Sequence, residues 1–296
     1  MRFTNSKAVI AAAGLALTLA ACGGGGDGAS GDHIELEVVE NPEHSGTPAD
    51  LAESGSIKIG VKVDQPGIGF KEPGEDLPTG FDIEMGRIIA AQLGIDPDSE
   101  NVEWVETISD NRESFIQNGT VDIVIASYSI TDERRQVVGQ AGPYYVTGQQ
   151  LLIRKADDEK ISGPEDLSGI KVCSVEGSTS LARVQDEYGA DPVPFGTYSE
   201  CVDQLENETV DAVTTDGAIL AGYAAENDEL TVVGEPFSEE RYGIGYKKGD
   251  AEMCQFLNNT IEGAFEDGTW EEAFEITLGQ ASGVETPEQP TLDPCE

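Results

Sequence analysis

Residues 107–135, TISDNRESFIQNGTVDIVIASYSITDERR, contain a helix start, a helix, a turn, a strand and a second helix start within 29 residues. Ser109 is a residue type that caps helices, and Asn118-Gly119 is typical of a helix end. The run from Val121 to Ile125 is short, apolar and rich in β-branched residues, which indicates a buried strand. Thr131 follows as a second candidate cap. The stretch therefore predicts one α/β unit.

Two arginines in this stretch lie at predicted helix starts, where the helix dipole disfavours cations. Arg134 follows Thr131 by three residues, and Arg112 follows Ser109 by three. An anion held between each guanidinium and the helix N-terminus would remove the conflict. The alternative is that both are surface arginines beside acidic neighbours, and the stretch alone is compatible with either.

The rest of the chain repeats the alternation of strands and helices. IKIGVKV (57–63) alternates as a strand does, with Lys62 near its end, and FDIEMGRIIAAQLG (81–94) has one apolar helical face. After the expected strand 149–154, the pattern restarts with a strand at 170–175. Strands that alternate with helices at this spacing predict a largely parallel α/β sheet.

One seven-residue pattern occurs twice. Residues 118–124, NGTVDIV, correspond to residues 207–213, NETVDAV. Polar residues follow both predicted strands, among them Ser127, Ser129 and Asp216. Ligands of open α/β sheets bind beyond the carboxyl ends of strands, so two facing units would place these residues on opposite walls of one cleft. Chance or common turn chemistry is the alternative for so short a match.

The charge balance excludes nucleic acid as a partner. The chain has 17 Lys and Arg against 57 Asp and Glu, and its net charge is −40. Without Arg2 and Lys7 the balance is 15 against 57, or −42. A polyanion would be repelled by this field, and high solubility, compatible with a salty habitat, is expected. Clustered cations in such a chain are therefore informative.

The N-terminus predicts export. Arg2 and Lys7 precede an apolar segment (8–21) that is too short to be a stable membrane span, and no later apolar stretch is long enough. Leu19-Ala20-Ala21-Cys22 resembles the bacterial lipoprotein signal, which implies a signal peptide at residues 1–21 and lipid on Cys22. A plain signal peptide is the alternative. We expect residues 22–54, which are rich in glycine and acidic residues, to form a flexible tether.

Cysteine usage agrees with an exported protein. Once Cys22 is lipidated, Cys173, Cys201, Cys254 and Cys295 remain, an even number. Both histidines lie in the expected tether, and no spacing suggests a zinc site. We therefore expect no metal site and no histidine-dependent catalysis. No cofactor and no other catalytic residue are expected either.

Several motifs together resemble the family 3 extracellular solute-binding proteins of ABC amino-acid importers. The resemblance covers roughly residues 55–280 and is carried by GFDIEM (80–85), IQNGTVDIVIASYSITDER (116–134), GPYY (142–145) and VDAVTTDGAILAGY (210–223). KVDQPG (62–67), the SDNR run and the pair Cys173 and Cys201 are similar to glutamate-binding lipoproteins of high-GC Gram-positive bacteria.

The resemblance implies a periplasmic-binding-protein-like α/β fold with two lobes, two hinge strands and a ligand cleft between the lobes. Residues 55–149 and 247–296 would form lobe 1 and residues 150–246 lobe 2, with crossovers near 149–154 and 242–247. Disulfides Cys173–Cys201 and Cys254–Cys295 are expected. The protein would be a monomer.

It also implies a role for each candidate ligand residue. Arg134 would bind the ligand α-carboxylate in a bidentate manner, with Ser129 and the backbone N–H groups of Ser178 and Thr179. The carbonyl of Ser127 and the carboxylate of Asp216 would bind the α-ammonium. Lys62, Ser109 and Arg112 occupy the places that bind the distal carboxylate in acidic-amino-acid binders. Tyr198 lies where some relatives have a histidine that contacts the ligand.

The function implied is delivery of an acidic amino acid, glutamate first, to the permease of an ABC importer from the outer face of the cell membrane. Glutamine, aspartate or another polar amino acid is the alternative ligand, and a sensor module for a membrane kinase is the alternative role. An enzyme on the same fold, a dehydratase or a transglycosylase, is less favoured, because no acid–base pair is evident among the cleft candidates.

Overall fold

The computed structural model describes residues 33–281, 284 and 286–295. The expected signal peptide, Cys22 and the first part of the expected tether lie outside the described residues. Within the described ranges, no helix is both long enough and apolar enough to cross a membrane.

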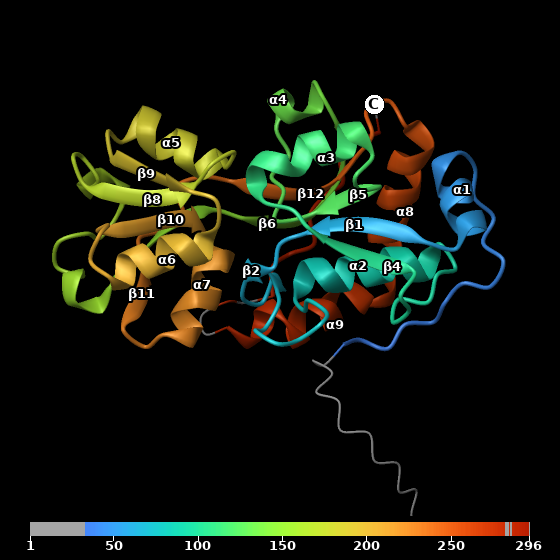
Figure 1. The fold of residues 1–296 in the computed structure, drawn as a ribbon, viewed down its shortest axis with the longest axis horizontal. Coiled ribbons are helices and arrows are strands. Elements are labelled where there is room, and N and C mark those ends of the chain that lie inside the picture. The colour runs from blue at the N-terminus through green and yellow to red at the C-terminus, as the bar shows by residue number, and fades with distance from the viewer. Residues whose placement is uncertain (1–32, 282–283, 285, 296) are drawn as a thin grey trace, which may run out of the picture. The chain divides into compact units, whose positions relative to one another are not determined.

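The first lobe is built on a five-stranded mixed sheet in the order β4-β1-β5-β12-β6 (Figure 1). Its strands are β1 (Ile57–Val61), β4 (Val102–Glu106), β5 (Ile123–Ile125), β6 (Gly139–Thr147) and β12 (Glu240–Tyr246). β1 runs parallel to β4 and β5, and β12 runs antiparallel to β5 and β6. The accompanying helices are α1 (Thr47–Ser54), α2 (Phe81–Gln92), α3 (Arg112–Asn118), α4 (Asp132–Arg135), α8 (Ala251–Asp267) and α9 (Thr269–Ile276).

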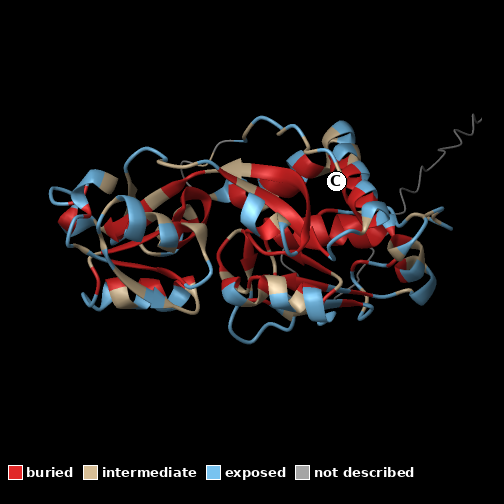
Figure 2. Cartoon of the chain, turned by 90° about the horizontal axis from the view of Figure 1, so that it is seen from above, coloured by how far each residue is buried: buried red, intermediate tan, exposed pale blue. Residues whose placement is uncertain are grey.

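The second lobe is built on a sheet in the order β11-β7-β10-β8-β9. Its strands are β7 (Gln149–Arg154), β8 (Lys171–Val175), β9 (Asp191–Phe195), β10 (Ala212–Asp216) and β11 (Leu230–Val233), with helices α5 (Thr179–Glu187), α6 (Tyr198–Glu206) and α7 (Gly217–Glu226). β8 pairs in parallel with β9 and β10, and β7 is antiparallel to β10 and β11. Figure 2 shows the buried strands beneath helices with exposed outer faces.

The two-lobed α/β architecture expected from the resemblance is confirmed, but one strand was assigned to the wrong lobe. Residues 240–246 were expected in lobe 2, yet β12 lies in the first sheet between β5 and β6. The chain crosses between the sheets at Gly148, and again in the segment 234–239 that precedes β12. Tyr242 of β12 packs against Tyr144 and Tyr145 of β6, and this aromatic contact belongs to the core of the first lobe.

The stretch 107–135 folds as α3, β5 and α4, as its pattern predicts. Thr131 caps α4 as expected, because its hydroxyl accepts a hydrogen bond from the backbone N of Arg134 (3.1 Å). The expected cap at Ser109 is wrong: α3 has no side-chain cap, and Ser109 lies in a preceding 3₁₀ turn, Ser109–Asn111. The Ser109 hydroxyl instead accepts a hydrogen bond from Lys62 (2.9 Å).

The expectation of a flexible tether through residue 54 is also wrong. Ile34 is only 3% exposed and belongs to the core of the first lobe, and residues 47–54 form α1. The backbone N of Val39 donates to the carbonyl of Ala91 in α2 (3.0 Å), and Arg87 donates to the carbonyl of Ile34 (3.3 Å). Ile34 and the partly buried Leu36 pack into the core of the first lobe, although the acidic residues around them predicted a tether.

Both expected disulfides are present in the structure. Cys173–Cys201 joins β8 to α6, with 5.5 Å between the Cα atoms, and Cys254–Cys295 joins α8 to the C-terminal tail, with 5.8 Å. Asp293 in that tail accepts from Arg135, directly after Arg134, at 2.6 Å. The tail is therefore tied both to α8 and to the short helix that carries Arg134.

Candidate functional site

Nine of the ten predicted ligand residues line one small cavity between the lobes, of about 10 Å³. They are Ser109, Arg112, Ser127, Ser129, Arg134, Ser178, Thr179, Tyr198 and Asp216, and the cavity is completed by Ser180, Thr215 and Ile219. The tenth, Lys62, contacts the lining through Ser109. A cavity of this size holds about one water molecule, so the two walls of the cleft are in contact.

The wall from the first lobe carries a cluster of three buried cations. Lys62, Arg112 and Arg134 are only 3%, 2% and 9% exposed. The guanidinium groups of Arg112 and Arg134 lie 4.5 and 4.8 Å from the ring centroid of Tyr128, within the range of cation–π attraction. Both arginines also donate to the carbonyl of Gly177 on the opposite lobe, at 3.2 and 2.9 Å. One carbonyl oxygen of the second lobe therefore accepts hydrogen bonds from two arginines of the first lobe.

The cations perturb one another. Burial, followed by the charge of Arg112, lowers the pKa of Lys62 from 10.5 to about 7. Burial and the charge of Arg134 lower the pKa of Arg112 to about 10. Both shifts disfavour the charged forms, and an anion placed among these groups would oppose both. The cluster gathers positive charge in a strongly anionic chain.

The wall from the second lobe provides a buried carboxylate with an unpaired oxygen. Asp216 ends β10, and its Oδ2 accepts from the hydroxyl of Tyr242 (2.6 Å). Its Oδ1 is buried and lacks a hydrogen-bond partner among the described residues. Burial, followed by the charge of Glu240, raises the pKa of Asp216 to about 7. A cation beside Oδ1 would satisfy this atom and favour the ionised form.

The carbonyl of Ser127 is held in place by an acid that the sequence analysis did not select. Ser127 has a left-handed backbone (φ 43°), and its N–H donates to Asp82 (2.7 Å). Asp82 also accepts from the hydroxyl of Tyr144 (2.5 Å), and burial raises its pKa to about 6. The Ser127 carbonyl faces Arg112, at 3.3 Å from Nη1. Asp82 lies in the first turn of α2, 45 residues before Ser127, so this contact depends on the tertiary fold.

The start of α5 forms part of the second wall through Ser178 and Thr179, and the backbone N of Ser178 donates to the carbonyl of Val175 (3.2 Å). Ser178 caps α5 by accepting from the backbone N of Leu181 (3.1 Å), as helix N-termini require. The hydroxyl of Thr179 donates to Glu240 (3.0 Å), a buried residue at the start of β12. Glu240 was also missed by the sequence analysis, because its neighbours along the chain carry no site motif.

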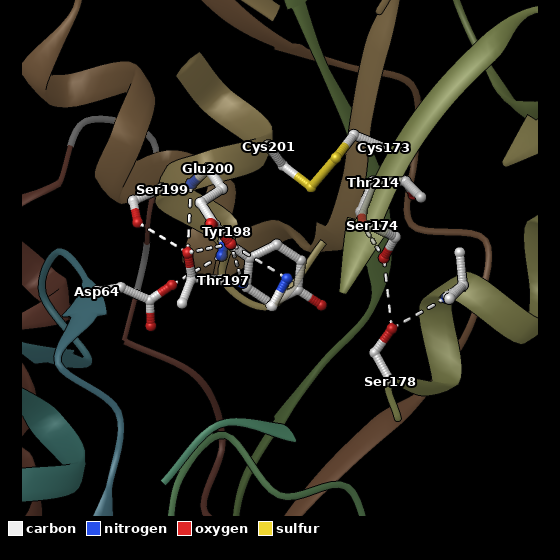
Figure 3. Close-up of a disulfide and its surroundings, with 12 residues drawn as sticks. Asp64, Cys173, Ser174, Ser178, Thr197, Tyr198, Ser199, Glu200, Cys201 and Thr214 are labelled. Atoms are coloured by element: carbon white, nitrogen blue, oxygen red, sulfur yellow. Dashed lines mark hydrogen bonds between the residues drawn. A yellow bond between two sulfur atoms is a disulfide. The ribbon is translucent and has the colours of Figure 1, made fainter. Parts of the chain in front are cut away.

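Tyr198 is positioned from two sides. The disulfide Cys173–Cys201 binds α6 to β8 three residues after Tyr198, and Asp64 of the first lobe accepts from the Tyr198 backbone N at 2.7 Å (Figure 3).

Beside the cavity, a wider groove of about 670 Å³ runs between α4 and α5 and shares Arg134, Ser178 and Thr179 with it. Of the three clustered cations, Arg134 is the one that borders both the cavity and this groove.

Comparison with known proteins identifies the class. The profile of the bacterial extracellular solute-binding proteins, family 3, matches residues 57–280, so the chain belongs to that family.

Among individual proteins, the chain is similar to the glutamate-binding protein GluB of Corynebacterium glutamicum, at 38% identity over 95% of this chain and 93% of that protein. GluB of Corynebacterium efficiens is 40% identical over the same shares. The glutamine-binding protein GlnH of Bacillus subtilis is 34% identical over 87% of this chain and 91% of that protein. These relatives are binding proteins of amino acids.

Solved structures agree with the fold and the class. The solute receptor for L-cysteine of Neisseria gonorrhoeae superposes with a TM-score of 0.75 at 28% identity, covering 81% of this chain and 97% of that one. An ancestral arginine-binding protein bound to glutamine gives 0.71 at 34% identity, covering 76% and 99%. An ancestral amino-acid-binding protein described as a precursor of cyclohexadienyl dehydratase gives 0.72 at 30% identity, covering 79% and 100%.

Proposed function

We propose that this chain binds L-glutamate in the cleft and delivers it to the permease of an ABC importer, as a lipoprotein held at the outer face of the cell membrane through Cys22. The observation that carries the proposal is the match of charges. Lys62, Arg112 and Arg134 are three clustered cations, and Asp216 is one carboxylate with an unpaired oxygen. Glutamate offers two carboxylates and one ammonium, the complementary set.

The proposed roles follow from which charges lie together. Arg134 and the N-terminal turn of α5 bind the α-carboxylate, because both lie at the Gly177–Thr179 loop. Asp216 binds the ammonium through Oδ1. Arg112 and Lys62, linked through Ser109, bind the distal carboxylate. In this arrangement the ligand carboxylates replace the Gly177 carbonyl as partners of the two arginines.

Glutamine is the second candidate, supported by the similarity to GlnH. An amide lacks the charge that three buried cations favour, so we rank it below glutamate. Calorimetric titration with L-glutamate, L-glutamine, L-aspartate and L-arginine separates the cases. Glutamate should bind most tightly and arginine should not bind, since its guanidinium would meet Arg112 and Lys62. Tighter binding of glutamine or arginine than of glutamate would overturn the proposal.

The dependence of affinity on pH should differ between glutamate and glutamine. Asp216 has a raised pKa of about 7 and must be ionised to bind the ammonium, so the Kd should rise about tenfold for each pH unit below 7. Lys62 has a lowered pKa of about 7 and must be protonated to bind the distal carboxylate, so the Kd for glutamate should also rise above pH 7. Arg112, with a pKa of about 10, stays mostly charged up to pH 9.

Glutamine lacks the distal charge, so its Kd should increase on the acid side alone. Titrations at half-unit steps from pH 5 to pH 9 measure both profiles. An equal alkaline rise for both ligands would contradict the role of Lys62, and a flat acid side would contradict that of Asp216.

A further inference from the structure

A second set of contacts joins the lobes away from the cavity. The hairpin formed by β2 (Asp64–Gln65) and β3 (Gly69–Phe70) follows β1 of the first lobe, and it lies against α6 and α7 of the second lobe. Its Asp64 carboxylate accepts from the backbone N of Tyr198 at 2.7 Å (Figure 3). Tyr198 is the first residue of α6, and its N–H is one that the helix itself leaves unpaired.

Helix α6 is therefore capped from both lobes. Thr197 of the second lobe accepts from the backbone N of Glu200 (3.3 Å), as part of a capping box within its own segment. Asp64 adds a carboxylate from the other lobe at the same helix end, where the dipole favours a negative charge. Separation of the lobes would remove the second cap and leave the first.

Helix α7 contacts the same hairpin closely. The hydroxyl of Tyr223 donates to the backbone carbonyl of Asp64. At the preceding position, a Cβ on Gly222 would lie 2.3 Å from the carbonyl oxygen of Pro66. Glycine is unfavourable in the middle of a helix, so its presence at this position is explained by the close approach of the hairpin backbone.

We propose that Asp64, Gly222 and Tyr223 form a latch that stabilises the closed cleft and raises affinity without contacting the ligand; this rests on the proposed function. None of the three is among the described residues that line the cavity. A contact between lobes contributes only when the lobes are together, so it favours the closed state and every ligand that binds there. These are positioning residues, and Asp64 acts on the site through Tyr198.

Asp64 could also affect binding through its charge, and the pattern of lost affinity separates this charge effect from the loss of the latch. Asp64 also raises the pKa of Lys62 by its charge, although burial and Arg112 lower it more. Loss of that charge alone would weaken glutamate and spare glutamine. Loss of the latch weakens both amino acids by the same factor, because closure does not depend on the ligand side chain.

The experiment compares two latch variants with two matched controls. Asp64→Ala removes the cap between lobes, and Asp250→Ala removes the cap of α8 within one lobe. Gly222→Ala places a methyl group against Pro66, and Gly263→Ala places one in α8 where nothing lies within 4 Å. Calorimetry with L-glutamate and L-glutamine gives Kd, thermal melting verifies folding, and small-angle scattering with and without each amino acid gives the radius of gyration.

We expect Asp64→Ala to raise the Kd of both amino acids by about 2- to 30-fold, the range for loss of a helix cap. Gly222→Ala should raise it by about 5- to 150-fold, the range for overpacking, while its melting temperature does not fall. Asp64→Asn, which keeps an acceptor but loses the charge, should restore most of the affinity for glutamine. Both controls should leave Kd within about twofold, although Asp250→Ala lowers the melting temperature.

The latch is overturned if Asp64→Ala and Gly222→Ala bind both amino acids as the parent chain does, or if Asp64→Ala weakens glutamate alone. If the parent chain binds neither amino acid, the proposed function fails, and scattering decides about the latch. A larger radius of gyration for Gly222→Ala than for the parent and for Gly263→Ala would then support it, and equal radii would overturn it.

Discussion

Replacement of Arg112 by alanine is expected to weaken glutamate binding by about 3 to 5 kcal/mol, or about 10² to 10³-fold and more, because a desolvated carboxylate would keep at most Lys62 as its cationic partner. Glutamine, which is neutral at that end, should lose much less. The preference for glutamate over glutamine should therefore shrink or invert. Calorimetric titration of both amino acids at pH 7 measures this change in preference.

Two control variants separate this effect from local damage. Arg112 donates to the carbonyls of Ser109, Ala126 and Ser127, so its loss also leaves backbone acceptors unpaired. Arg112→Lys keeps the charge and loses the fork of donors, and it should lower affinity while retaining a preference for glutamate. Arg134→Ala should weaken both amino acids alike. Equal losses of glutamate and glutamine in Arg112→Ala would show that the distal site lies elsewhere.

The second large effect is expected at Asp216. Asp216→Asn should weaken glutamate and glutamine alike by about 3 to 5 kcal/mol, because a buried ammonium would lose its anionic partner. The hydroxyl of Tyr242 can still donate to an asparagine oxygen, so the fold is retained. Titration at pH 8, where Asp216 of the parent chain is mostly ionised, measures the full loss, and the rise of Kd on the acid side should disappear.

Glu240→Gln is the matched control for Asp216→Asn. Glu240 is buried nearby and does not line the cavity, but its charge raises the pKa of Asp216. The amide keeps an acceptor for the Thr179 hydroxyl. Affinity at pH 8 should change little, and the acid side of the profile should move to lower pH. A large loss at pH 8 in Glu240→Gln but not in Asp216→Asn would reverse the proposed roles.

Two errors in the predicted organisation have the same origin. Residues 33–54 are strongly acidic, and composition predicted a tether, yet Ile34 is buried and Arg87 binds its carbonyl. Residues 240–246 were grouped with the lobe that precedes them in the chain, yet they pair with β5 and β6. In both cases the decisive partners are more than 50 residues away, so local pattern and composition carry little information about them.

The sequence by itself determined the elements and the residue types of the site. The hydrophobic period and the cap and turn residues of residues 107–135 predicted α3, β5 and α4. The position of Arg134 at a capped helix start was compatible with a bound anion and also with a surface arginine. These are local signals, since helix caps and strand runs depend on neighbours within a few residues. The ligand roles of the site residues remain predictions.

Tertiary structure alone decided which charges face one another. The meeting of Arg112 and Arg134 at the Gly177 carbonyl, the support of Ser127 by Asp82, and the cap that Asp64 gives to Tyr198 join segments 43 to 134 residues apart. Burial in the closed cleft also sets the pKa values of Lys62 and Asp216 near 7. Desolvation and contacts between lobes depend on how the sheets are brought together, and no local pattern records that arrangement.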